Sequence, residues 1–165
     1  MTDRTIRLEP LTRAAFAPFG QVIETDGANH YAINKGMTER FHDLANIEIG
    51  GENGRPLISI MRTKPYSLPL AVSLLERHPF GSQAFFPLSG RPWVSIVAPD
   101  AGGVPGRPVA FLCRADQGIN IARNTWHAVL TALHEVSEFL VVDRGGDGNN
   151  LEEVTLDEPW LVIES

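Results

Sequence analysis

Glycine and proline interrupt this chain so often that they leave little room for long helices. Fifteen Gly and twelve Pro lie among its 165 residues and separate short apolar runs. Both residues disfavour helix interiors and are typical of turns. Short runs rich in β-branched and aromatic residues between turns are typical of strands. We therefore predict an all-β fold, in a single domain over residues 1–165, since this length suits one hydrophobic core.

Strands and one helix can be placed along this pattern. Thr12 is a suitable N-cap for a short helix over residues 12–19, which Gly20 would end. An extended segment is expected at residues 21–24. The runs that we expect to be strands are residues 57–62, 85–88, 93–98, 109–113, 128–132 and 138–143.

Residues 70–78 allow two interpretations. Their leucines could form a helical stripe, but apolar and polar residues also alternate, and prolines on both sides limit the run to nine residues. That length favours a strand. Strand periodicity places Glu76 and His78 on one face and Arg77 on the other. There Arg77 could pair with Asp143 or across a dimer interface.

The same segment begins a spaced motif of potential ligands. Glu76, His78 and Gln83 are followed by Gly90 in the pattern Glu-x-His-x4-Gln-x6-Gly, and His127 follows a polar turn about forty residues later. This resembles the two-part cupin signature, with Glu76 in place of its first His and Gln83 in place of its Glu. The resemblance implies a cupin-like double-stranded β-helix barrel whose interior collects these side chains.

A more specific resemblance covers nearly the whole chain. The motifs that carry it are Asn34-Lys35-Gly36, Glu39-Arg40-Phe41-His42-Asp43-Leu44, Glu76-Arg77-His78-Pro79, Gln83-Ala84-Phe85, Arg123-Asn124-x-Trp126-His127 and Asp143-Arg144-Gly145-Gly146. In this order they resemble the ureidoglycolate lyase family. The resemblance implies a homodimer that splits (S)-ureidoglycolate into glyoxylate and urea during allantoin breakdown. It also implies an association with a divalent metal, with nickel as the named ion.

The elimination of urea requires a base, an acid and a cationic clamp for the substrate carboxylate. Glu76, His78 and His127 are the candidate catalytic groups, because histidine titrates near neutrality and burial tends to raise a carboxyl pKa. For the substrate we expect Arg123 to hold the carboxylate in a two-point contact. Gln83 can hydrogen-bond the substrate without titrating.

Three other parts of the motifs have open roles. Arg144 is a second candidate for the carboxylate clamp, although its Gly-rich surroundings are equally typical of a structural turn. Arg40, His42 and Asp43 could support the site, contribute to a lid, or form a solvated face.

A divalent metal would change the roles of the same residues. Glu76, His78, Gln83 and His127 offer mixed nitrogen and oxygen ligands that suit a borderline cation. However, glutamine is a weak ligand, so metal-free acid/base chemistry is the favoured interpretation and metal assistance the alternative. A different metal-dependent cupin, or a cupin that only binds a small carboxylic acid, also remains open.

Charge and cysteine content restrict the partners and the compartment. The net charge is −6 and the basic residues are scattered, which argues against a nucleic-acid partner. No stretch reaches the length of a membrane span, and the N-terminus lacks the apolar segment of a signal peptide. Cys113 is the single cysteine, so no internal disulfide is possible. We expect a cytoplasmic protein whose partner is a small molecule.

Overall fold

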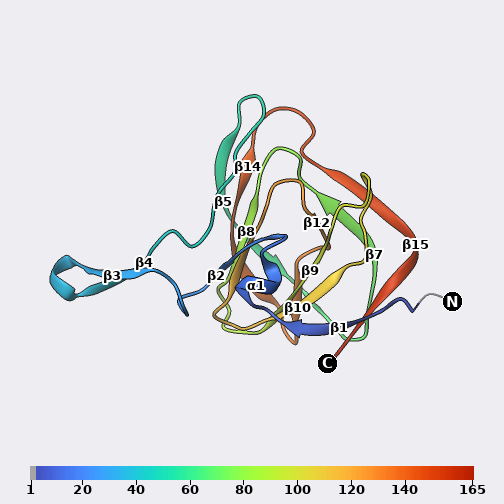
Figure 1. The fold of residues 1–165 in the computed structure, drawn as a ribbon, viewed down its shortest axis with the longest axis horizontal. Helices are drawn as coiled ribbons and strands as arrows, with labels where there is room; N and C mark the ends of the chain where they lie inside the picture. Colours follow the sequence, from blue (N-terminus) through green and yellow to red (C-terminus); the bar gives the residue numbers. More distant parts are fainter. Residues whose placement is uncertain (1–2) are drawn as a thin grey trace.

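The computed structural model describes residues 3–165 and consists almost entirely of strands (Figure 1). Its helical elements are α1 (Arg13–Phe16) and the 3₁₀ turn η1 (Asn34–Gly36). The strands are β1 (Thr5–Pro10), β2 (Gly20–Ile23), β3 (His30–Ile33), β4 (Thr38–Phe41), β5 (Arg55–Thr63), β6 (Pro65–Tyr66), β7 (Leu70–Arg77), β8 (Gln83–Pro87), β9 (Trp93–Ala98), β10 (Val109–Cys113), β11 (Gly118–Ile121), β12 (Trp126–His127), β13 (Thr131–Leu133), β14 (Ser137–Gly145) and β15 (Glu152–Ile163).

Two sheets form the body of the molecule. The larger has the order β10-β1-β15-β7-β12-β9-β13-β6, and an additional pairing of β9 with β10 closes its first part into a ring. The smaller has the order β2-β11-β8-β14-β5. This closed barrel with one short α-helix confirms the predicted all-β, cupin-like fold.

Strand β9 separates two apolar clusters, one inside the ring and one between the two sheets. On β9, Ile96 points into the ring with Trp126 and Trp160, whereas Val97 points towards the smaller sheet and packs near Phe139. The alternation follows the two-residue period of a strand, which sends neighbouring side chains to opposite faces. Side chains on the second face therefore lie between the two sheets.

The structure confirms some of the predicted helices and strands and corrects others. Thr12 caps α1 by accepting a hydrogen bond from Ala15 N at 3.2 Å, but the helix ends earlier than predicted. The segment 70–78 is the strand β7, as expected. The predicted strand 128–132 is only partly correct, because the regular structure there is β12 and β13 with an irregular link between them. The long C-terminal strand β15 and the hairpin β3–β4 were not predicted.

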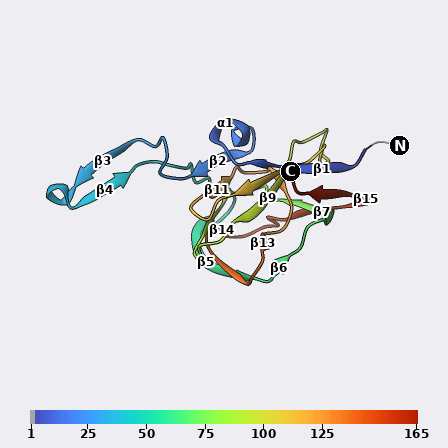
Figure 2. The same cartoon turned by 90° about the horizontal axis from the view of Figure 1, so that it is seen from below.

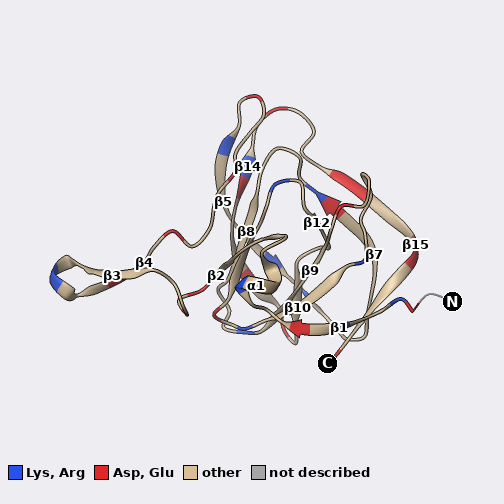
Figure 3. Ribbon diagram, viewed as in Figure 1, with Lys and Arg blue, Asp and Glu red and all other residues tan. Residues whose placement is uncertain are grey.

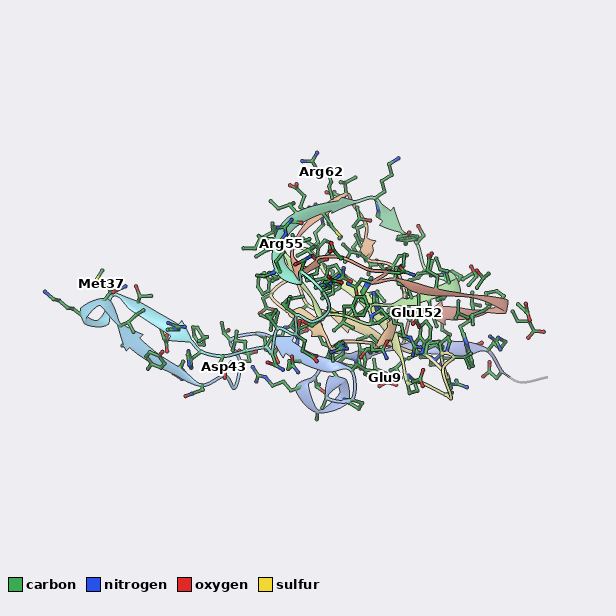
Figure 4. The ribbon with its side chains drawn as sticks, turned by 90° about the horizontal axis from the view of Figure 1, so that it is seen from above. Glu9, Met37, Asp43, Arg55, Arg62 and Glu152 are labelled. Atoms are coloured by element: carbon green, nitrogen blue, oxygen red, sulfur yellow. The ribbon has the colours of Figure 1, made fainter. Side chains whose placement is uncertain are left out.

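The hairpin β3–β4 forms an arm that projects from the barrel (Figures 1 and 2). Its tight tip has positive φ at Asn34 and Lys35, and Met37 there is 85% exposed. Figure 4 shows Met37 at the far end of the arm and Asp43 near its base. The arm carries Arg40 and carries the strand that leads to His42, whose Nδ1 lies 3.5 Å from the Tyr31 hydroxyl.

Charged residues of both signs are interspersed along the strands (Figure 3). Within residues 3–165, no helix combines the length and the apolar character that a membrane crossing requires.

Candidate active site

Two neighbouring strands bring the first candidate residues together. His127 on β12 lies directly opposite Glu76 on β7 in the antiparallel register. Leu75, which precedes Glu76, is fully buried in the ring cluster, so Glu76 faces away from that cluster. Arg77 returns to the opposite face, as predicted, but it pairs with Asp100 and Glu152 rather than with Asp143.

Glu76, His78 and His127 converge in space. His127 Nε2 lies 3.5 Å from Glu76 Oε1, and His78 Nε2 lies 3.9 Å from the same oxygen. The centroids of the two imidazole rings are 5.1 Å apart. Among residues 3–165, these three side chains form the one group of three or more metal-capable residues whose ligand atoms lie within 4.8 Å of one another.

The hydrogen bond at Nδ1 of each imidazole determines whether Nε2 carries a proton or a lone pair. His78 Nδ1 lies 2.8 Å from the carbonyl oxygen of Asn150, and His127 Nδ1 lies 3.0 Å from that of Thr125. A carbonyl oxygen only accepts hydrogen bonds, so we assign the proton of each neutral ring to Nδ1. The Nε2 lone pairs are then left facing Glu76.

Both Nε2 atoms are buried and have no hydrogen-bond partner among the described residues. Buried polar atoms are rarely left unpaired in proteins without a functional reason. Two imidazole Nε2 atoms and one carboxylate, with each Nδ1 held by a carbonyl, match the ligand set of a divalent metal. The residues present therefore fit such an ion.

The environment of Glu76 lowers its pKa instead of raising it. The largest cause is the neighbouring His127 side chain, whose Nε2 lies 3.5 Å from the carboxylate, and the positive charge that His127 and His78 carry when protonated adds to this effect. Together they outweigh the desolvation that burial imposes. The expectation of a raised carboxyl pKa was wrong, because it counted burial without the neighbouring imidazoles.

Gln83 is buried on β8, and its Nε2 donates a hydrogen bond to Asp143 Oδ2 at 3.1 Å. Its neighbour Phe85 belongs to the cluster between the sheets, so strand alternation places Gln83 on the inner face. Its roles as substrate contact and fourth metal ligand stay predictions.

Arg123 lies at the surface, on the turn between β11 and β12. The turn is fixed beside the triad because Asn124 N donates to the carbonyl oxygen of His78 at 2.9 Å. The Arg123 side chain donates from Nε to the carbonyl oxygen of Pro79, and its backbone N donates to Glu48 Oε1 at 3.0 Å. Within the described chain its Nη groups have no protein acceptor, so they are free to bind an anion.

Arg144 has a different environment, because it is buried and its guanidinium is engaged. It donates hydrogen bonds of 2.9–3.1 Å to the carbonyl oxygens of Gly50, Glu52 and Asp147. The ring of Phe80 lies against it, 5.0 Å from the guanidinium carbon. These contacts join two loops and indicate a structural role, and the role of Arg144 as a substrate clamp stays a prediction.

Several residues of this region were missed by sequence reasoning. Asn150 accepts from Phe80 N through its side chain at 2.7 Å, besides holding His78 through its carbonyl. Glu48 is held by Ser82, whose hydroxyl accepts from Glu48 N at 2.8 Å. A backbone carbonyl or a brace between loops has no signature in the sequence, so no signal could have identified them.

The triad lies apart from another concavity of the described chain. A cavity of about 620 Å³ is lined by residues that include Leu8, Tyr66, Leu133 and His134, none of which belongs to the triad. We assign the site to the triad because convergent titratable groups indicate chemistry more directly than volume does.

Comparison with known proteins agrees with the motifs in the sequence. The family model described as ureidoglycolate lyase matches residues 3–163. Proteins named ureidoglycolate lyase are similar over most of their length: one from Chelativorans sp. is 57% identical over 159 residues, covering 96% of each chain. One from Mesorhizobium japonicum is 59% identical over 153 residues, covering 93% of each chain. One from Brucella melitensis biotype 1 is 56% identical over 165 residues, covering 100% of this chain and 98% of the relative. The chain belongs to the ureidoglycolate lyase family.

Proposed function

We propose that this protein cleaves (S)-ureidoglycolate into glyoxylate and urea. The observation that carries the proposal is the convergence of Glu76 with two unpartnered imidazole nitrogens, in a chain of this family. The substrate bears a hydroxyl and a ureido nitrogen on one carbon. Loss of the hydroxyl proton forms the aldehyde of glyoxylate, the C–N bond breaks, and the leaving nitrogen takes up a proton to give urea.

The triad supplies groups for both proton transfers. Glu76 has a lowered pKa and is ionised at neutral pH, so it enters the reaction as a proton acceptor. His127 and His78 flank the same carboxylate oxygen, so the proton that Glu76 accepts can pass to the Nε2 of one of them and from there to the leaving nitrogen. Arg123 holds the substrate carboxylate at the rim, where its Nη groups contact no acceptor of the described chain.

The same side chains can instead hold a divalent metal, for which nickel is the ion that the family resemblance implies. Glu76, His78 and His127 would be its ligands. When bound, such an ion supplies Lewis-acid chemistry that lowers the pKa of a coordinated hydroxyl. In that case the carbonyls of Asn150 and Thr125 orient the imidazole ligands, and Arg123 still binds the substrate carboxylate.

We further propose a homodimer in the cytoplasm. On the outer face of the smaller sheet, Ile58 and Ile60 are 77% and 61% exposed and pair with Val142 and Leu140. An apolar sheet face of this kind indicates an interaction surface. The arm β3–β4 is a two-stranded hairpin, which is marginally stable alone, so a second subunit would stabilise it. Light scattering should give the mass of two chains, and a monomer at micromolar concentration would contradict the dimer.

The test of the activity is product release from racemic ureidoglycolate, with and without a chelator. Glyoxylate and urea from half of the substrate, without ammonia, are expected of a stereospecific lyase. Activity that survives chelation supports direct acid/base chemistry, whereas loss that nickel or manganese restores supports metal ligation. Stoichiometric ammonia, or binding of the substrate without turnover, would refute the proposal.

A further inference from the structure

Behind the triad, on the opposite face of the same strands, lies a second cluster that the proposed chemistry does not use. Its centre is Arg77, the residue between Glu76 and His78. The Arg77 side chain is only 14% exposed. Because arginine is seldom buried without partners, its contacts identify what holds it there. Its three partners are Asp100, Glu152 and Trp126.

The contacts of Arg77 are well defined. Its Nε donates to Glu152 Oε2 at 2.6 Å and its Nη1 donates to Asp100 Oδ1 at 2.9 Å. The guanidinium carbon lies 4.2 Å from the centroid of the Trp126 ring, within the range of a cation–π contact. Trp126 Nε1 donates to the same Asp100 Oδ1 at 2.9 Å, which closes the cluster.

Asp100 is itself held in place. Its second oxygen accepts a hydrogen bond from Gly103 N at 3.0 Å. The hydrogen bond from Trp126 is the largest cause that lowers the pKa of Asp100, followed by that from Gly103, with the charge of Arg77 contributing less. Asp100 is therefore a charged anchor at neutral pH.

Two of the three partners of Arg77 lie close in sequence to the carbonyls that orient the histidines, and Asp100 is linked to them through Trp126. Glu152 is the first residue of β15, pairs with Arg77 in register, and follows Asn150 by two positions (Figure 4 labels Glu152). The carbonyl of Asn150 holds His78 Nδ1. Trp126 lies between Thr125, whose carbonyl holds His127 Nδ1, and His127 itself.

We propose that Arg77 is a positioning residue that holds the Asn150 and Thr125 carbonyls in place and so keeps the Nε2 lone pairs of His78 and His127 directed at Glu76. Arginine suits this role because its planar fork can bond two carboxylates while its face stacks on an indole. As a statement about catalysis the inference rests on the proposed function. As a statement about the two imidazole rings it is independent of that function.

The test compares Arg77→Gln and Arg77→Lys with Arg4→Gln as a matched control. Arg4 also stacks on a tryptophan of the ring cluster, 4.4 Å from the Trp160 centroid, and pairs with Glu158, but it adjoins no candidate catalytic residue. Thermal unfolding and circular dichroism establish that each variant is folded. The readouts are the ¹⁵N chemical shifts of the imidazole nitrogens, which report the tautomer, and kcat and KM for glyoxylate release.

In the wild type, His78 and His127 should each show a single tautomer with the proton on Nδ1. Arg77→Gln should show mixed tautomers and a kcat lower by about 10- to 100-fold, as is found for residues that orient ligands or catalytic groups, with KM changed far less. Arg77→Lys keeps the charge, so its kcat and its tautomer populations should lie between those of the wild type and those of Arg77→Gln. Arg4→Gln should lower the melting temperature without changing kcat or the tautomers.

Arg77→Gln with wild-type tautomers and kcat, or with changes that match those of Arg4→Gln, would overturn the proposal. A wild type that releases no glyoxylate refutes the proposed function alone, because the tautomers still report on Arg77. Should Arg77→Gln not fold, Asp100→Asn and Glu152→Gln each remove one charged partner. Asp100→Asn should then loosen His127, and Glu152→Gln should loosen His78; unchanged tautomers in both would overturn the proposal.

Discussion

Replacing Arg123 with methionine separates substrate binding from structural support, because Met retains much of the side-chain length and loses the charge. The Nη groups of Arg123 bind no described protein acceptor, so the variant loses one hydrogen bond to Pro79 in the free protein. A two-point contact with the substrate carboxylate consists of charge-assisted hydrogen bonds of about 1.5–3 kcal/mol each. Since the Arg123 side chain is exposed, we take about 2–3 kcal/mol for the pair after solvent screening.

At about 1.36 kcal/mol for each factor of ten, this loss lowers kcat/KM by about 30- to 160-fold. The melting temperature should change little, because one exposed hydrogen bond contributes about 1 kcal/mol or less. The assay is the initial rate of glyoxylate release over a range of ureidoglycolate concentrations, with thermal unfolding of the same sample. Arg123→Lys, which keeps a point charge, should recover part of the activity.

Arg144→Met is the contrasting variant. Arg144 donates three hydrogen bonds to loop carbonyls, and their loss at about 1 kcal/mol each removes about 3 kcal/mol of stability. For a chain of this size about 2–4 °C are lost per kcal/mol, so the melting temperature should fall by about 6–12 °C. KM should stay close to that of the wild type. A raised KM with unchanged melting in Arg144→Met, together with normal kcat/KM in Arg123→Met, would show that the two roles are reversed.

Further predictions concern the triad, the core and the dimer. Glu76→Gln should lower kcat by at least about 100-fold, because it removes the proton acceptor. It should also weaken the binding of added nickel ion in titration calorimetry, because it removes the charged ligand of the triad. The lowered pKa of Glu76 means that its ionised form stabilises the folded protein above the ordinary glutamate value of 4.5. Denaturant titrations should therefore show this contribution present at pH 5 and lost as the pH falls below about 4.5; a loss already complete at pH 5 would contradict the lowered pKa. Burial raises the pKa of Cys113, so a thiol reagent should modify it only after unfolding, and rapid labelling of the native protein would refute this. Ile58→Arg should shift the protein to a monomer in light scattering, and an intact dimer would place the interface elsewhere.

Strand periodicity explains why much of the site could be predicted from the sequence. The alternation in residues 70–78 places Glu76 on one face and Arg77 on the other, and the structure confirms both positions. The spacing to His127 indicates convergence because a cupin-like barrel pairs these segments. The predicted rise in the pKa of Glu76 was wrong, since the sequence does not show how close the imidazoles would lie.

The roles of Arg123 and Arg144 could not be distinguished from the local sequence pattern. Arg123 and Arg144 are both clamp candidates in the sequence, because each lies in a motif of the family resemblance. Within residues 3–165, the tertiary structure leaves the Nη groups of Arg123 without a protein acceptor and engages Arg144 with three carbonyls. Burial and the position of distant carbonyls depend on loops that are brought together only by folding.

By itself the sequence determined the β class, through its turns and alternating strands, and the identity of the triad, through residue types at a fixed spacing. Only the tertiary structure decided the tautomers of His78 and His127, because the carbonyls of Asn150 and Thr125 reach them through folding. It also decided the two carboxylate partners of Arg77, which come from segments 23 and 75 residues away in the chain. The periodicity of a strand depends on residues that are neighbours in the sequence. The direction of a lone pair depends on atoms that are distant in the sequence and adjacent in space.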